Sequence, residues 1–184
     1  MSNRWIIGVR AVAGLALLVS VAVLAGCFET NYSLGSKDAA VVDVAYCGDW
    51  NVVDKEHPTD PPSVRMFIRN LDGKQYFVEW TEAGKNGEAD KSLRMIGFTA
   101  EVNGATFAHL RDLPEDGTIP EKHLIMRVGL KDGVLTLRNL DEKFFTEHNP
   151  VQSDAELRRV IEQNLDNDAM YDSGTVTAVR PAGK

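Results

Sequence analysis

The fold is decided by the stretch Leu93-Arg-Met-Ile-Gly-Phe-Thr-Ala-Glu-Val102, Asn103-Gly104, Ala105-Thr-Phe-Ala-His-Leu110. Two runs rich in apolar and aromatic residues flank the Asn-Gly pair. Both residues of this pair readily adopt the positive φ angles that a tight hairpin turn needs. The sequence therefore predicts two antiparallel strands, 93–102 and 105–110, joined by a two-residue turn.

The same pattern recurs on both sides of this hairpin. In several short runs, apolar and polar residues alternate with a period of two, which is typical of strands with one face toward a core. Asp-Gly pairs at 72–73 and 132–133 separate further runs, so three successive hairpins form an antiparallel meander. The remaining predicted strands are 49–53, 64–69, 75–80, 123–130, 134–140 and 175–180.

One helix interrupts the strands. Ser153-Asp-Ala-Glu156 has the pattern of a capping box. Leu157, Val160, Ile161 and Leu165 then recur at helical spacing on one face. The predicted fold is mainly β, with about eight strands and one helix. It is a closed or nearly closed small barrel, because closure removes exposed sheet edges. A curved open antiparallel sheet packed on the helix is the alternative.

Length and composition fit one ordinary globular domain. The chain has 184 residues, of which 43% are hydrophobic and 26% charged. Removing Arg4 and Arg10 from the 20 basic residues leaves 18 against 27 acidic residues, a net charge of −9. Nucleic-acid binding depends on Lys and Arg that neutralise phosphates. Because this part of the chain is strongly acidic, the sequence predicts no nucleic-acid partner.

The first 26 residues have the plan of a secretory signal peptide. Arg4 and Arg10 form a positive region, and residues 11–25 form an apolar run of 15 residues. That run is short for a membrane-spanning helix, which needs about 20 residues. The sequence predicts a signal peptide at 1–26 and a mature chain outside the cytoplasm.

Leu24-Ala25-Gly26-Cys27 resembles the lipobox of bacterial lipoproteins. The resemblance implies cleavage between Gly26 and Cys27, a diacylglyceryl group on the Cys27 thiol and a palmitate-like acyl chain on its amine. Thiols are the soft nucleophiles that such a thioether requires. The partner it implies is the envelope membrane. Phe28, and not Asp, follows Cys27. The resemblance therefore implies that the protein is anchored in the outer membrane and not retained in the inner membrane.

The mature chain then divides in two. Residues 28–43 are polar and rich in small side chains, so 27–43 is predicted to be the lipidated cysteine and its tether. Residues 44–184 are predicted to be a single β-rich domain. Gly48-Asp49-Trp50 at its start resembles the Gly-x-Trp opening of lipocalin-like barrels. The resemblance implies that Trp50 lies buried at a closed end, whereas Trp80 is expected to be more exposed.

Motif searches predict no catalytic, cofactor or metal site. Cys47 is the only thiol left once Cys27 is modified, and we expect it to be buried and inert, a reactive thiol being the alternative. The four histidines have no metal-ligand spacing, and each is expected to be satisfied locally. They are His57, His109, His123 and His148.

Carboxylates and aromatic residues are the remaining candidates. The acidic residues group at 112–121 and at 166–172, where the spacing misses the calcium-loop pattern. Aromatic residues on strands predict core positions, or alternatively a barrel mouth lined for an apolar ligand. The acidic residues are Asp112, Glu115, Asp116, Glu121, Asp166, Asp168 and Asp172. The aromatic residues are Trp50, Tyr76, Trp80, Phe98, Phe107, Phe144 and Phe145.

The sequence thus predicts a lipid-anchored envelope protein that is not an enzyme. We expect it to bind a small apolar ligand or a protein partner near the membrane. The alternative is a hydrolase that assembles its site from acidic loop residues. The barrel interior separates these hypotheses, since an open cavity with converging polar groups favours a binder or an enzyme and a filled interior favours a scaffold.

Overall fold

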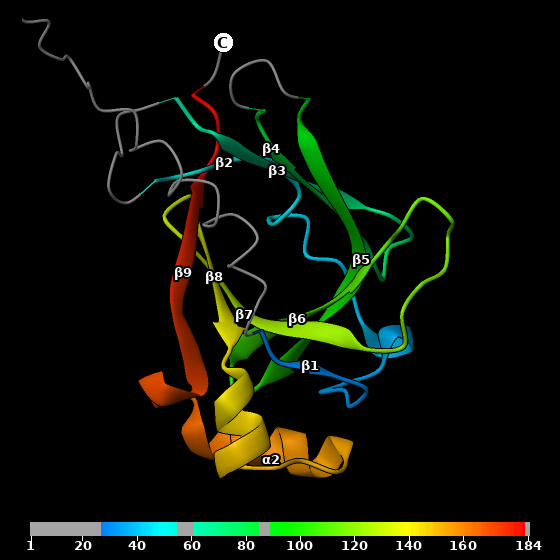
Figure 1. Cartoon of the computed structure of the whole chain (residues 1–184), viewed down its shortest axis with the longest axis vertical. Helices are drawn as coiled ribbons and strands as arrows, with labels where there is room; N and C mark the ends of the chain where they lie inside the picture. The colour runs from blue at the N-terminus through cyan, green and yellow to red at the C-terminus, as the bar shows by residue number, and fades with distance from the viewer. Residues whose placement is uncertain (1–26, 55–60, 85–88, 183–184) are drawn as a thin grey trace, which may run out of the picture.

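The computed structural model describes residues 27–54, 61–84 and 89–182 and shows a closed antiparallel barrel (Figure 1). Each of the eight barrel strands pairs with the next one along the chain, and the last of them, β9, pairs back with the first, β2. The predicted fold class is confirmed, in its closed form. The barrel strands are β2 (Gly48–Val52), β3 (Val64–Asn70), β4 (Tyr76–Glu82), β5 (Lys91–Val102), β6 (Ala105–Asp112), β7 (His123–Lys131), β8 (Val134–Leu140) and β9 (Tyr171–Val179).

Two hairpin turns are the tight turns that their dipeptides predict, whereas at Asp72-Gly73 only Gly73 has a positive φ, of 83°, within a longer loop. Asn103 and Gly104 have φ angles of 48° and 78°, and Asp132 and Gly133 have 51° and 78°. Two consecutive positive φ values define the turn whose twist matches that of antiparallel strands. These turns set the register of β5 with β6 and of β7 with β8.

The barrel closes through β2 and β9. Asn51 lies opposite Val179, and Val52 lies opposite Ala178. Trp50 on β2 is 1% exposed, so its predicted burial is confirmed, but it packs among barrel residues such as Met66 and not with the helix at 154–164. Its indole Nε1 donates to the Tyr46 carbonyl at 2.9 Å. The Arg180 guanidinium lies 4.4 Å from the centre of the Trp50 ring. Trp80 is only partly buried.

Two apolar clusters form the core. One fills the lumen, with Met66, Val78, Leu110, Met126 and Leu135 among its members. The other lies between the barrel and α2 (Asp154–Asn164), which covers one end of the barrel below β1 in Figure 1. This second cluster holds Phe107 of β6, Phe144 and Phe145 of the π-helical turn η2 (Phe144–His148), and Leu157 and Ile161 of α2.

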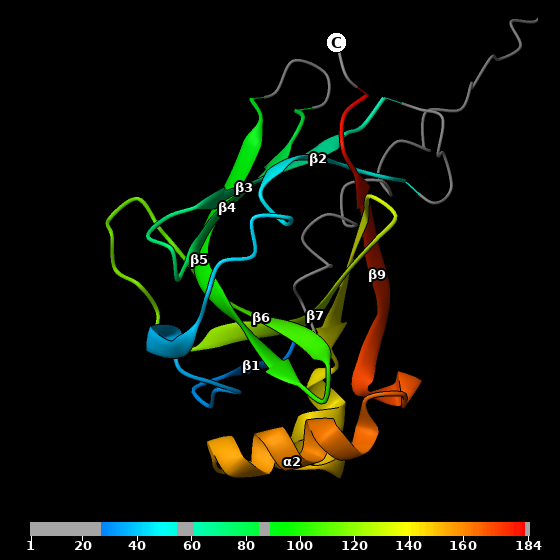
Figure 2. The same ribbon diagram turned by 180° about the vertical axis from the view of Figure 1, so that it is seen from behind.

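The segment preceding β2 belongs to the folded body. The sequence predicted a tether over 28–43, but Phe28, Leu34 and Val42 are 4%, 2% and 8% exposed. β1 (Glu29–Thr30) pairs with β7, and a short 3-10 turn, η1 (Lys37–Ala39), follows. Figure 2 shows the segment running from β1 past β5 toward β2. Its buried residues are sparse and irregularly spaced, so no periodicity revealed them.

We call residues 28–40 the N-terminal strap. Helix α2 holds it in place at two points. The Ser33 amide donates to Asp154 Oδ1 at 2.8 Å, and the Arg158 guanidinium donates to the Leu34 carbonyl. The same guanidinium donates to the Glu101 carbonyl of β5 at 3.3 Å. The strap, the helix and the barrel wall are therefore joined by one set of hydrogen bonds.

Candidate functional site

The lumen of the barrel is nearly filled by side chains. Its cavity has a volume of about 50 Å³, and its lining is apolar, from residues such as Ile68, Met126 and Leu137. For comparison, an apolar cavity of roughly 150 Å³ holds a molecule as small as benzene. The lumen as described has no room for a lipid or a cofactor.

A larger hollow lies on the outside of the barrel, beside the strap. It has a volume of about 370 Å³, and we call it the outer groove. Phe28 and Phe145, whose rings stack with centroids 4.5 Å apart, lie at its base. This volume is near the lower end of the range of small-molecule sites, roughly 300–1,000 Å³. The groove is lined by residues 28–32, Lys122, Phe145, Thr146, Pro150 and Val151.

Cys27, the predicted lipidation site, lies directly before the groove residues. Its side chain is 7% exposed and packs with the lumen cluster. Burial, and then the negative charges of Asp172, Glu29 and Glu142, raise the pKa of its thiol to about 11. A thiol held neutral in this way is a poor nucleophile. Any acyl transfer to Cys27 therefore has to occur while the residue lies outside this position. Gly26 and the rest of 1–26 lie outside the described residues.

Cys47 lies just before β2 and is half-buried, so it is less enclosed than expected. Its carbonyl accepts a hydrogen bond from the Arg180 guanidinium at 3.1 Å, and the Ala45 carbonyl accepts another at 2.9 Å. Gly48 follows with a φ of +143°, and a Cβ there would collide with that guanidinium. The main-chain carbonyls of Ala45 and Cys47 thus hold the Arg180 guanidinium against the Trp50 ring.

The histidines differ from one another. His57 lies outside the described residues, and His148 is exposed. His123 on β7 is 4% exposed and its Nε2 lies 2.7 Å from the Tyr32 carbonyl of the strap. His109 on β6 is 1% exposed, yet neither ring nitrogen has a hydrogen-bond partner among the described residues. The expectation of local satisfaction is therefore wrong for His109.

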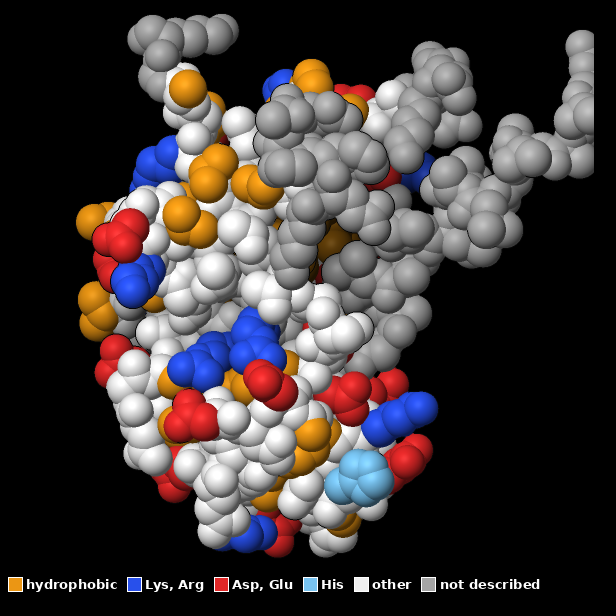
Figure 3. Space-filling view, turned by 90° about the vertical axis from the view of Figure 1, so that its left-hand side faces the viewer, with side chains coloured by type: hydrophobic (Ala, Val, Ile, Leu, Met, Phe, Trp, Pro, Cys, Tyr) orange, Lys and Arg blue, Asp and Glu red, His pale blue; other side chains and the backbone are white. Residues whose placement is uncertain are grey.

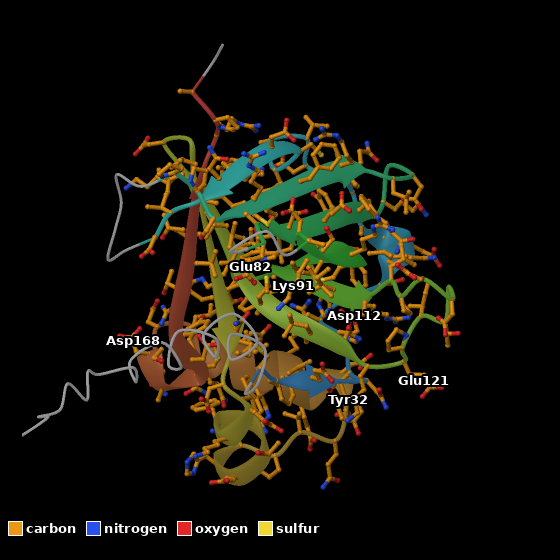
Figure 4. All side chains as sticks on the ribbon, turned by 45° about the horizontal axis from the view of Figure 1, so that its top comes forward. Tyr32, Glu82, Lys91, Asp112, Glu121 and Asp168 are labelled. Atoms are coloured by element: carbon orange, nitrogen blue, oxygen red, sulfur yellow. The ribbon has the colours of Figure 1, made fainter. Side chains whose placement is uncertain are left out.

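The acidic residues are not gathered into one site. In Figure 4, Asp112 and Glu121 lie on one side of the molecule and Asp168 on the other. Asp168 pairs with Arg138 at 2.9 Å, and Asp172 accepts from the Asn139 amide at 3.0 Å. Glu115, Asp116 and Asp166 are exposed. In residues 27–54, 61–84 and 89–182, no group of three or more His, Cys, Asp or Glu is arranged to hold a metal ion.

The aromatic residues are mostly core, as predicted. Trp50, Tyr76, Phe107, Phe144 and Phe145 are buried, although the last two lie on η2 and not on a strand. On the surface, Figure 3 shows basic and acidic side chains side by side on the face that it presents. Three large apolar residues are exposed around the β3–β4 hairpin, where the Val42 amide donates to the Gly73 carbonyl: Val41 at 77%, Val44 at 70% and Leu71 at 54%.

Comparisons with protein-family models, with curated proteins and with solved structures found no match to this chain. In the part of the chain that the structure describes, no helix is both long and apolar enough to cross a bilayer.

Sequence reasoning missed the outer groove and the buried histidine pair. The groove joins β1 to the segment after η2, and the two histidines meet only through the pairing of β6 with β7. The sequence contained one sign of this pair: His109 lies two residues after Phe107 on a predicted strand, so both side chains point to the same face. The partner strand's register was needed to interpret it.

Proposed function

We propose that this protein is a lipid-anchored protein of the bacterial envelope that binds a small apolar ligand in its outer groove and is not an enzyme. The observation that carries the proposal is the contrast between a lumen cavity of about 50 Å³ and a groove of about 370 Å³. A ligand larger than a few atoms fits the groove and does not fit the lumen.

The anchor is supported by the sequence. Leu24-Ala25-Gly26-Cys27 resembles a lipobox and follows a positive region and an apolar run. Two or more acyl chains bind a protein stably to a membrane, because each buried methylene contributes about 0.8 kcal/mol. The groove begins at Phe28, the residue after the proposed anchor, so a ligand leaving the bilayer has a short path to it.

The chemistry of the groove favours an apolar chain with an anionic end. Pro150 and Val151 offer apolar surface above the buried rings of Phe28 and Phe145, and Lys122 supplies a cation at the same hollow, which Glu29 also lines. A fatty acid has both features. The carboxylate would pair with the Lys122 ammonium, and the chain would contact Pro150 and Val151.

The anchor is tested by Cys27→Ser. Without a thiol, we expect no diacylglyceryl transfer and an accumulation of unprocessed precursor. Metabolic labelling with a radioactive fatty acid, followed by gel electrophoresis, reports both effects. Cys47→Ser is the matched control and should be labelled and processed normally. Normal acyl labelling of Cys27→Ser would disprove the anchor.

The groove is tested by titrating a fluorescent long-chain fatty acid into the domain from residue 28. Val151→Asp places a charge in the groove, and we expect it to weaken binding at least about tenfold, since an unpaired carboxylate on an apolar surface costs more than 1.4 kcal/mol. Leu71→Asp, on an exposed hairpin outside the groove, should bind like the unmodified domain. Unsaturable binding, or equal binding by both variants, would refute the groove as the site.

A protein partner is the second candidate, favoured by the exposed apolar residues Val41, Val44 and Leu71. The same two variants separate the candidates in cells. A cross-link to an envelope protein that Leu71→Asp loses and Val151→Asp keeps would favour this second function.

A further inference from the structure

Of the two buried histidines, His123 contacts the N-terminal strap, and His109 lies beside His123 on the neighbouring strand. On β6, Ala108 and Leu110 face the lumen cavity, so His109 points to the outer face by the alternation of a strand. Its ring stacks on Phe98 of β5, with centroids 4.7 Å apart, and lies 4.9 Å from the ring of His123 on β7. Phe98, His109 and His123 therefore form a row of rings across three neighbouring strands on the outside of the barrel.

The strap crosses these same three strands. At β7 the Tyr32 carbonyl lies 2.7 Å from His123 Nε2. At β5 the strap passes so close to the wall that a Cβ on Gly35 would lie 3.1 Å from that of Ala100. Between the two, on β6, His109 is 1% exposed. The Ser33 and Leu34 contacts with α2 hold the strap down over the pair.

We propose that the N-terminal strap is an acid-sensitive latch: the docked strap encloses His109 and His123 in their neutral forms, and acidification releases it from the outer face of β5, β6 and β7. A docked imidazolium at His109 would have no hydrogen-bond acceptor among the described residues. Release exposes the ring to solvent, where it can carry the charge.

The charged groups around His109 all lower the pKa of its imidazole. Burial, then the neighbouring His123 and the Arg111 guanidinium of β6, lower the pKa of His109 from 6.5 to about 3. Burial also lowers the pKa of His123. Main-chain groups of Tyr32 and Glu121 and the Asp154 carboxylate of α2 oppose that shift, and Arg111 adds to it.

The sign of the pH dependence follows from these shifts. Above pH 6.5 both states of the strap keep His109 neutral, so docking has its full stability. Between pH 6.5 and about 3 the released state binds a proton that the docked state does not, so docking weakens as the pH falls. His109 alone makes the opening constant about 30-fold larger at pH 5.0 than at pH 7.5, and His123 can only add to this.

Release also removes one side of the outer groove, because residues 28–32 of the strap line it. This consequence rests on the proposed function: a ligand held in the groove at neutral pH would be discharged in acid. The strap would then extend the path between the anchored Cys27 and β2. The latch itself does not depend on the anchor or on the ligand.

Hydrogen–deuterium exchange of the full-length protein in detergent micelles tests the latch without any ligand. We expect the protection of strap peptides, corrected for the intrinsic pH dependence of exchange, to fall at least about 30-fold between pH 7.5 and 5.0. Peptides from β3 and β4 should stay protected over that range. His109→Gln/His123→Gln should abolish the pH dependence of the strap, and His148→Gln, on the exposed surface, should keep it.

Equal loss of protection in the strap and the barrel would overturn the latch, because it would report global unfolding. Unchanged strap protection down to pH 5.0 would overturn it as well. If the double variant fails to fold, the wild-type comparison of strap with barrel peptides still decides. A released strap together with unaltered fatty-acid binding at pH 5.0 would retain the latch and refute the groove.

Discussion

At the scale of single residues, Trp50 links the first barrel strand, β2, to Arg180, which follows the last strand, β9. Its indole is held by the Tyr46 carbonyl from one side, and the Arg180 guanidinium covers its ring from the other. Arg180 in turn is fixed by the carbonyls of Ala45 and Cys47. The tripeptide from Gly48 to Trp50 thus predicts a buried tryptophan, but its partner Arg180 could not be predicted from a motif so far away.

Trp50→Ala should lower the free energy of unfolding by about 3–5 kcal/mol, because it removes a buried aromatic side chain and leaves a cavity. Urea denaturation of residues 27–184 measures this loss. Trp80→Ala is the matched control and should cost clearly less, since Trp80 is only partly buried. In single-tryptophan proteins, acrylamide should quench Trp80 more readily than Trp50. The reverse order would contradict the packing described for Trp50.

At the scale of elements, α2 begins where the capping pattern predicts. The Glu156 amide donates to Ser153 Oγ at 3.2 Å. The Glu156 carboxylate, however, accepts from the amide of Gln152 at 2.8 Å, one residue earlier than in the standard box. Two of the next residues, Asp154 and Arg158, hold the strap. The cap therefore sets the position of the groups that fasten the N-terminal segment.

Ser153→Ala should destabilise the domain by about 1 kcal/mol through loss of the N-cap. Glu156→Ala should cost less, and the double variant should cost less than the sum, since both side chains serve one helix end. Thermal or urea unfolding measures the three values. Ser173→Ala, at an exposed position on β9, should leave stability unchanged. Strictly additive losses would show that the two side chains act independently.

Strands were predictable at this scale because their signals are local. Asn103-Gly104 and Asp132-Gly133 mark turns whose φ angles are the ones those residues favour. β1 and the π-helical turn η2 were not predicted. β1 has two residues and depends on pairing with β7, and η2 depends on packing Phe144 and Phe145 against the helix cluster. Neither has a sequence period of its own.

At the scale of the whole molecule, closure could be inferred only as one of two outcomes. An alternating pattern shows that each strand has an inner face, but the pairing of β2 with β9 decides between barrel and open sheet. The same limit applied to the candidate site. The groove and the His109–His123 pair come from segments that the topology brings together, so they appeared only once the sheet order was known.

The pairing of Asn51 with Val179 also determines when the fold can be completed. A ribosome makes β2 long before β9, so until β9 has been made the outer edge of β2, and later that of β8, has no neighbour. Contacts between such distant parts of a chain form slowly, because a long loop must close first. Until β9 pairs, these two edges can pair with another chain, so a chaperone that covers sheet edges would protect the protein most before β9 is in place.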